Sequence, residues 1–196
     1  MKKMNKTLIA VVAAVVIIGF WMSSSYNSMV SEQEKATTAL ANVQSAYQRR
    51  ADLIPNLVET VKGYAAHEKE TFEAVTSARA KATSINVELA NMTPEKIKQF
   101  QDAQGELATA LGRLLRVQEQ YPELKANENF RDLQVQLEGT ENRINEARNT
   151  YNQVVQQYNV SVRSFPKNVL AGMFGFAQMQ KFESEAGAEK APQVKF

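Results

Sequence analysis

The hydrophobic positions of the chain form two patterns that meet near residue 31. The first is an unbroken run of 15 apolar residues, LIAVVAAVVIIGFWM (8–22), inside a window without charged residues from 7 to 31. Beyond residue 31, apolar residues recur at alternating intervals of three and four, the spacing of one face of an α-helix. Alternating runs that would indicate strands are missing there, so the chain is predicted to be all-α.

The second pattern is divided into four amphipathic helices by a few breaks. These are turn and cap signals, at Gly63–His67, Thr93-Pro94, Tyr121-Pro122 and Phe165-Pro166. Short connections between long amphipathic helices favour an antiparallel up-down-up-down four-helix bundle, here continuous with the N-terminal apolar helix. A single coiled rod is the alternative, and the breaks argue against it.

The N-terminal apolar run predicts a transmembrane anchor over residues 7–25. A bilayer is crossed by about 20 apolar residues, and Trp21 and Tyr26 lie where aromatic residues favour the membrane interface. A cleaved signal peptide is the alternative, because the apolar core is short and three serines follow it. The anchor interpretation implies a single-pass membrane protein.

The orientation of this anchor follows from the lysines before it. Lys2, Lys3 and Lys6 precede the span, and Lys35 is the only basic residue soon after it. The positive-inside rule then leaves the N-terminus in the cytoplasm and the body outside, which in a bacterium is the periplasmic or outer side. The cytoplasmic side is the alternative, since short N-terminal tails can also be translocated.

The up-and-down topology predicts which segments lie close to the membrane. If the first helix leads away from the membrane, the fourth returns to it. The predicted segments are a basic tail (1–6), the anchor (7–25), the four-helix bundle (26–164), an apolar segment at the membrane-proximal end (165–182) and a flexible tail (183–196).

Composition excludes several functional classes. The chain has no cysteine and one histidine, His67, so it offers too few thiolate and imidazole ligands for a zinc site. Three of the 23 basic residues precede the span, which leaves 20 against 21 acidic residues and no basic face for nucleic acid. No nucleophile turn or phosphate-binding loop is present. We therefore expect no catalytic, metal or cofactor-binding residues, no cofactor and no small-molecule substrate.

A set of charged residues lies on or near the predicted helix seams, with Arg50 on the seam itself. A buried charge costs several kcal/mol unless it is paired, so we expect a belt of ion pairs between helices; exposure of the arginines to solvent is the alternative. The candidates are Arg50, Asp52, Arg79, Glu138, Glu141 and Arg148.

Three other residues are candidates for a change of direction. Pro55 removes one main-chain donor, so the first helix is expected to bend there, or a new helix to begin near Asp52. Gly63 and His67 are expected to form the turn into the second helix, with His67 in a capping or pairing role.

The apolar segment 165–182 has two interpretations. In the first, Phe165, Leu170, Phe174 and Phe176 fold back over the open end of the bundle. In the second, this segment contacts the membrane interface or a second subunit. The contact candidates are Val169, Leu170, Met173, Phe174 and Phe176.

Long strings of the chain resemble the LemA family of bacterial membrane-anchored proteins. They are RRADLIPNLVETVKGYAAHEKETFEAVTSARA (49–80), LEGTENRINEARNTYNQVVQQYN (137–159) and FPKNVLAGMFGF (165–176), with Tyr26-Asn27 following the span. The resemblance covers about 26–182. It implies a single-pass protein of the bacterial inner membrane with a helical-bundle domain and no established catalytic activity, so no catalytic residue is carried over. It also implies a loose association with membrane organisation and with envelope stress or quality control.

Together these observations predict a non-enzymatic, membrane-anchored scaffold or interaction module of the bacterial envelope. We expect it to contact the bilayer through 7–25, to form a homo-oligomer and to take part in membrane organisation. The alternative is a regulator or adaptor of an envelope protease or another membrane protein in stress response or quality control. Nucleic acid is not an expected partner.

Overall fold

The computed structural model describes residues 6–89 and 92–183, and no β-strand occurs in these two ranges. The prediction of an all-α fold is confirmed. The helices are α1 (Lys6–Lys62), α2 (Lys69–Ser84), α3 (Pro94–Arg116), the 3-10 turn η2 (Val117–Glu119), α4 (Pro122–Ala126), α5 (Glu128–Arg163) and α6 (Lys167–Phe174).

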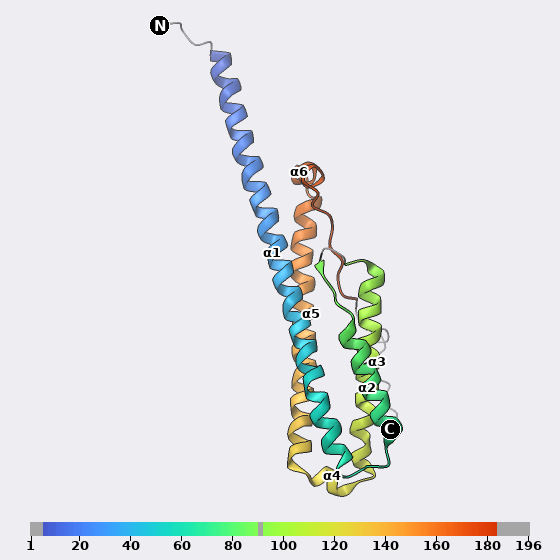
Figure 1. Ribbon diagram of the computed structural model, residues 1–196. Coiled ribbons are helices and arrows are strands. Elements are labelled where there is room, and N and C mark those ends of the chain that lie inside the picture. Colours follow the sequence, from blue (N-terminus) through green and yellow to red (C-terminus); the bar gives the residue numbers. More distant parts are fainter. Residues whose placement is uncertain (1–5, 90–91, 184–196) are drawn as a thin grey trace, which may run out of the picture.

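The longest element, α1, has 57 residues and joins the apolar run to the first amphipathic helix without interruption. Its N-terminal part contains an 18-residue window of mean hydropathy 2.3, none of which is buried. This part projects beyond all other helices (Figure 1). Burial begins at Ser25 and Met29, where the other elements reach α1. The apolar part of α1 is therefore long and apolar enough to cross a membrane, and it lacks intramolecular cover.

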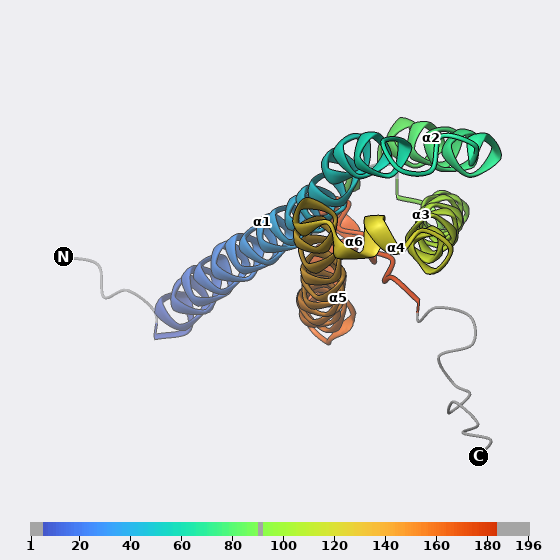
Figure 2. The same ribbon diagram turned by 90° about the horizontal axis from the view of Figure 1, so that it is seen from below.

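The long helices are arranged as two antiparallel pairs (Figures 1 and 2). In the first pair, α5 runs back along α1, with Tyr158 near Met29 at one end. In the second pair, α2 and α3 pack together, and Lys81 of α2 forms an ion pair with Glu106 of α3 at 2.7 Å. Viewed from below, α3 and α5 stand apart, and the chain that follows α6 passes between them (Figure 2).

Several helix ends follow from capping chemistry. The Thr93 hydroxyl accepts a hydrogen bond from Lys96 N (3.3 Å) with Pro94 in the first turn of α3, as the sequence predicts. Asn127 Oδ1 accepts from Phe130 N (2.9 Å) at the start of α5. At the end of α6, Gly175 has φ +77°, a left-handed conformation that favours glycine. Gly175 turns the chain back toward the body.

The apolar interior is divided into three clusters along the length of the molecule. The distal cluster contains Leu57, Phe72 and Leu107, and the central one packs the rings of Tyr47 and Phe100 edge to face at 5.0 Å. The third cluster joins α1, α5 and α6 just beyond the apolar part of α1. The three clusters hold the helices together from the distal turn up to the end of the predicted anchor.

The segments at the two ends of the chain are described only in part. Of the basic tail 1–6 only Lys6, and of the expected flexible tail 183–196 only Glu183, lie within the described residues. The apolar segment after α5 forms α6 beside α1, and residues 176–183 then run back along α5 without regular structure. We call residues 176–183 the C-terminal strap.

Candidate functional site

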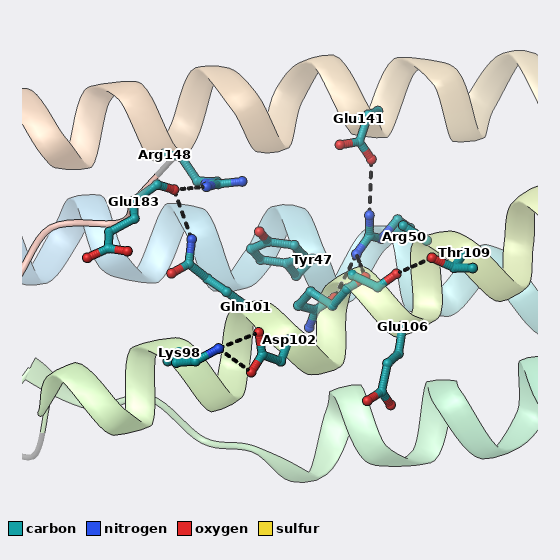
Figure 3. A pocket seen from close by; sticks show the side chains of 13 residues that line it. Tyr47, Arg50, Lys98, Gln101, Asp102, Glu106, Thr109, Glu141, Arg148 and Glu183 are labelled. Carbon is teal, nitrogen blue, oxygen red and sulfur yellow. Dashed lines mark hydrogen bonds and ion pairs between the residues drawn. The ribbon is translucent and has the colours of Figure 1, made fainter. Parts of the chain in front are cut away.

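A polar cleft of about 710 Å³ lies between α1, α3 and α5 (Figure 3). Its lining side chains come from all three helices and from the end of the C-terminal strap. They are Tyr47, Arg50, Lys98, Gln101, Asp102, Gln104, Gly105, Glu106, Ala108, Thr109, Glu141, Arg148 and Glu183. The cleft therefore gathers three of the six charged residues that the sequence suggested.

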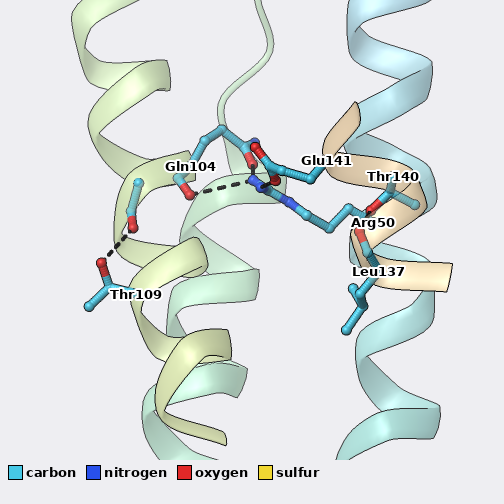
Figure 4. Close-up of polar contacts among 7 residues, drawn as sticks. Arg50, Gln104, Thr109, Leu137, Thr140 and Glu141 are labelled. Carbon is cyan, nitrogen blue, oxygen red and sulfur yellow. Dashed lines mark hydrogen bonds and ion pairs between the residues drawn. The ribbon is translucent and has the colours of Figure 1, made fainter. Parts of the chain in front are cut away.

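Arg50 is the centre of this cleft and is 4% exposed (Figure 4). Its Nη1 donates to Glu141 Oε2 of α5 at 3.0 Å, and its Nη2 donates to Gln104 Oε1 of α3 at 2.7 Å. Gln104 in turn donates through Nε2 to the main-chain oxygen of Ala82 in α2 (3.3 Å). One buried guanidinium thus connects α1 to α5 and α3, and through Gln104 to α2.

Arg79 has a different partner from the carboxylate that the sequence analysis expected. Its Nε donates to the main-chain oxygen of Ala51 in α1 at 2.9 Å. Pro55, four residues after Ala51, has no N–H, so this carbonyl lacks its usual intrahelical donor. Arg79 of α2 supplies the missing hydrogen bond. Pro55 and Arg79 together form a docking point between α1 and α2.

Pro55 therefore does not start a new helix. α1 continues unbroken from Lys6 to Lys62 with Pro55 inside it, so the alternative of a helix beginning near Asp52 is wrong. The physical reason is that one lost hydrogen bond is replaced from α2. Gly63 and His67 lie in the connection between α1 and α2.

The other members of the expected ion-pair belt are arranged differently. Asp52 accepts from Gln48 Nε2 (2.7 Å), and Glu138 accepts from Gln134 Nε2 (3.3 Å), each within its own helix. Both carboxylates therefore face away from the cleft and are satisfied locally. Among the described residues Arg50 pairs with Glu141, whereas Arg79 and Arg148 donate to main-chain oxygens.

The C-terminal strap is held by asparagine side chains of α5, which the sequence analysis did not single out. Asn159 donates to Met179 O and accepts from Met179 N, both at 2.8 Å. Asn152 makes the same pair of bonds with Phe182, at 2.8 Å to its oxygen and 2.9 Å from its nitrogen. Each amide thus pairs with both main-chain groups of one strap residue, as a neighbouring β-strand would.

Further side chains complete the fastening of the strap. Tyr151 donates to Gln180 O (2.9 Å), and Glu183 O accepts from Arg148 Nη2 (2.6 Å) and from Gln101 Nε2 of α3 (2.9 Å). Burial raises the pKa of the Tyr151 phenol above its ordinary value. Six of these seven bonds come from α5 and one from α3, so the strap closes the space between the two helices.

A sequence signal for this contact exists. Asn145, Asn152 and Asn159 recur every seven residues, on one stripe of α5. Asparagine is a poor helix former, and three at heptad spacing on an exposed or half-buried stripe indicate a ladder of amides. What the signal lacks is the identity of the segment that the ladder binds.

The membrane-contact candidates fall into two groups. Val169 and Met173 are 54% and 68% exposed, and Phe174 is half exposed while its ring packs on Tyr26 of α1 at 5.0 Å. Leu170 is 4% exposed and lies in the cluster with Met29 and Tyr158, so it is unavailable for a membrane or subunit contact. Its position on the inner face of α6 explains the difference.

Two more aromatic residues of this region, Phe176 and Phe165, differ in their exposure to solvent. Phe176 is half-buried beside Tyr26, with ring centroids 5.5 Å apart. Phe165 is 84% exposed and does not cover the end of the body, contrary to the first interpretation of this segment. Val169 and Met173 on α6 and Phe165 just before it are thus exposed apolar side chains, and we call these three the apolar patch of α6.

Most charged side chains of the cleft are paired with one another or with main-chain oxygens. In residues 6–89 and 92–183 no group of three His, Asp or Glu side chains is placed to hold a metal ion. Lys98 pairs with Asp102 at 2.9 Å and Glu106 with Lys81 at 2.7 Å, and the Thr109 hydroxyl donates to Gly105 O. These charged side chains form ion pairs with each other, and the polar contacts of the cleft connect α1, α3 and α5.

These features define a class: a membrane-associated, all-helical protein with one apolar helix that extends from a body of paired helices. A model of the LemA family matches residues 39–196. The chain belongs to the LemA family.

Similarity to individual proteins agrees with this assignment. The chain is 26% identical over 181 residues to magnetosome protein MamQ 2 of Paramagnetospirillum magneticum, covering 84% of this chain and 66% of the relative. It is 27% identical over 180 residues to magnetosome protein MamQ of Magnetospirillum gryphiswaldense, covering 83% and 66%. Protein LemA of Metamycoplasma hominis is 25% identical over 145 residues, covering 74% and 63%. The chain thus spans just under two thirds of the length of these relatives, whose names denote no enzymatic activity.

Proposed function

We propose that this protein is a non-enzymatic scaffold of the bacterial envelope, anchored through residues 7–25 and assembled from several copies. The observation that carries the proposal is the placement of two exposed apolar surfaces at one end of the molecule. One is the apolar part of α1, and the other is the patch formed by Phe165, Val169 and Met173. Exposed apolar surface that gathers at one end of a molecule suits a bilayer or a second subunit.

The patch supports a proposal about how the body is oriented at the membrane. Phe174 packs on Tyr26, only a few residues beyond the apolar run of α1. An apolar helix that lies in the interface plane inserts its apolar face at the headgroup boundary. In this proposal α6 rests on the bilayer and holds the long body at a fixed angle to it, with the body on the outer side.

The relatives support a role at membranes. Two of them are named as magnetosome proteins, and we propose that this chain contributes to the organisation of a membrane. The regulator of an envelope protease remains the alternative function, and it makes a different prediction about what is bound to the purified protein.

Purification in a mild detergent, followed by native mass spectrometry, tests the proposal. We expect a homogeneous species that contains several copies of the chain. A stoichiometric complex with a second, different protein would instead favour the regulator. A monomer at membrane-like concentrations would overturn self-assembly.

A further inference from the structure

The contact between α5 and the C-terminal strap has the properties of a peptide-binding groove. Asn152 and Asn159 are seven residues apart, which is about 10.5 Å along a helix. Their partners Phe182 and Met179 are three residues apart, which is about 10 Å along an extended chain. Two helical turns therefore match three residues of extended peptide, and each asparagine meets a main-chain N–H and C=O at the same spacing.

Recognition in this groove is mainly recognition of the main chain. In the described residues, 177–183 make no main-chain to main-chain hydrogen bonds, and side chains of α5 and α3 supply the partners instead. Two strap side chains give sequence preference. Phe182 is 4% exposed, its ring packs against Tyr151 at 5.2 Å, and the Arg148 guanidinium lies 5.8 Å from it, while Met179 packs against two of the apolar clusters. The groove thus takes an extended peptide with one buried aromatic residue.

The strap is also joined to the body in a way that permits exchange. It follows Gly175, whose φ of +77° turns the chain at the end of α6. Its first residue, Phe176, is held by one main-chain bond to Ala171 O (2.9 Å) and by ring contact with Tyr26. Beyond that point every described hydrogen bond of the strap's main chain is made to a side chain of α5 or α3, and an identical chain can supply each of them.

We propose that this groove binds the strap of a second copy of the chain, so that neighbouring molecules exchange residues 176–183. The inference rests on the self-assembly proposed above. The four residue steps from Gly175 to Met179, the first residue bound in the groove, reach about 13 Å when extended, slightly more than the diameter of a helix. Copies anchored in one bilayer in one orientation hold Gly175 and the groove at equal heights, and exchange of an identical element is a low-cost route to a dimer.

The absence of cysteine from the chain allows a direct test. Lys181 Nζ lies 3.5 Å from Gln156 Oε1, and both residues are exposed. Two full-length chains of different size, one with Gln156→Cys and one with Lys181→Cys, are co-expressed and treated in the membrane with a short bifunctional thiol reagent. We expect a mixed product that contains one chain of each size.

Two matched controls show whether the mixed product depends on the position of the cysteine and on the asparagines that bind the strap. Val135→Cys, 67% exposed near the start of α5, replaces Gln156→Cys and should give only background mixed product. Adding Asn152→Ala and Asn159→Ala to the Gln156→Cys chain should lower the mixed product about ten-fold, since four hydrogen bonds are lost. Asn145→Ala, an exposed member of the same asparagine stripe, should leave it unchanged.

The outcomes separate this inference from the proposed function. If a chain with both cysteines is linked only within itself, and the co-expressed pair gives no more mixed product than the Val135→Cys control, strap exchange is overturned. Native mass spectrometry of the same sample then shows whether the oligomer persists without exchange. Linkage of the Gln156→Cys chain to a different cellular protein, in place of a second copy, also overturns the proposal.

Discussion

Arg50 is buried, whereas its partner Glu141 has a side chain that is 46% exposed. Arg50→Met should therefore lower the free energy of unfolding by about 1–3 kcal/mol, because Gln104 loses a charged partner while Glu141 can be hydrated again. Thermal unfolding followed by circular dichroism in detergent measures this. Arg49→Met, at the exposed neighbouring position, is the matched control. Equal stabilities of the two variants would contradict a structural role for Arg50.

The docking of Arg79 on the carbonyl left free by Pro55 predicts an energetic coupling. Arg79→Met should cost about 1–3 kcal/mol in the presence of Pro55, as expected for a hydrogen bond from a charged donor. In a Pro55→Ala background the same change should cost less, since residue 55 then donates to Ala51 O itself. A double-mutant cycle by chemical denaturation measures the difference. An identical cost in both backgrounds would show that the two residues act independently.

Tyr151 gives the molecule a dependence on alkaline pH. Burial raises its pKa in the folded state above the ordinary value of 10.0, so the folded state retains a proton that the unfolded state loses. The stabilising contribution is complete below about pH 10 and is lost as the pH rises above it. Tyr151→Phe should make the loss of stability above pH 10 less steep, as followed by thermal unfolding at a series of pH values. Equal slopes for wild type and Tyr151→Phe would refute this assignment.

At the scale of one element, α6 should touch the bilayer on its exposed face. Met173→Cys labelled with a polarity-sensitive dye should give blue-shifted emission in liposomes, with quenching by brominated lipids. The same dye at Val135→Cys, similarly exposed but near the start of α5, should report water. Matching spectra at the two positions would show that α6 does not contact the bilayer. Its apolar patch would then be assigned to contact with a second subunit.

At the scale of the whole molecule, the lysines before the span predict on which side of the membrane the body lies. A C-terminal alkaline phosphatase fusion should be active and a C-terminal β-galactosidase fusion inactive, because the positive-inside rule retains Lys2, Lys3 and Lys6 in the cytoplasm. Enzyme assays on intact cells measure both. The reverse pair of activities would put the body in the cytoplasm.

Periodicity and composition were sufficient for the architecture of single elements. The apolar run, the three-and-four spacing and the cap at Thr93 are local properties, and they predicted the helices and the start of α3. The strings around 49–80 and 165–176 also placed the chain in its family. An apolar window long enough for a bilayer needs no tertiary context to be recognised.

What only the tertiary structure decided is which residues meet. Arg79 pairs with Ala51 O, Leu170 is buried while Val169 is exposed, and the asparagines of α5 bind the strap. Each of these joins elements that are distant in sequence, and helical periodicity carries no information about which faces of two helices come together. An extended segment such as 176–183 has no period of its own. Its position is determined by the hydrogen bonds between its main chain and the asparagine side chains of α5.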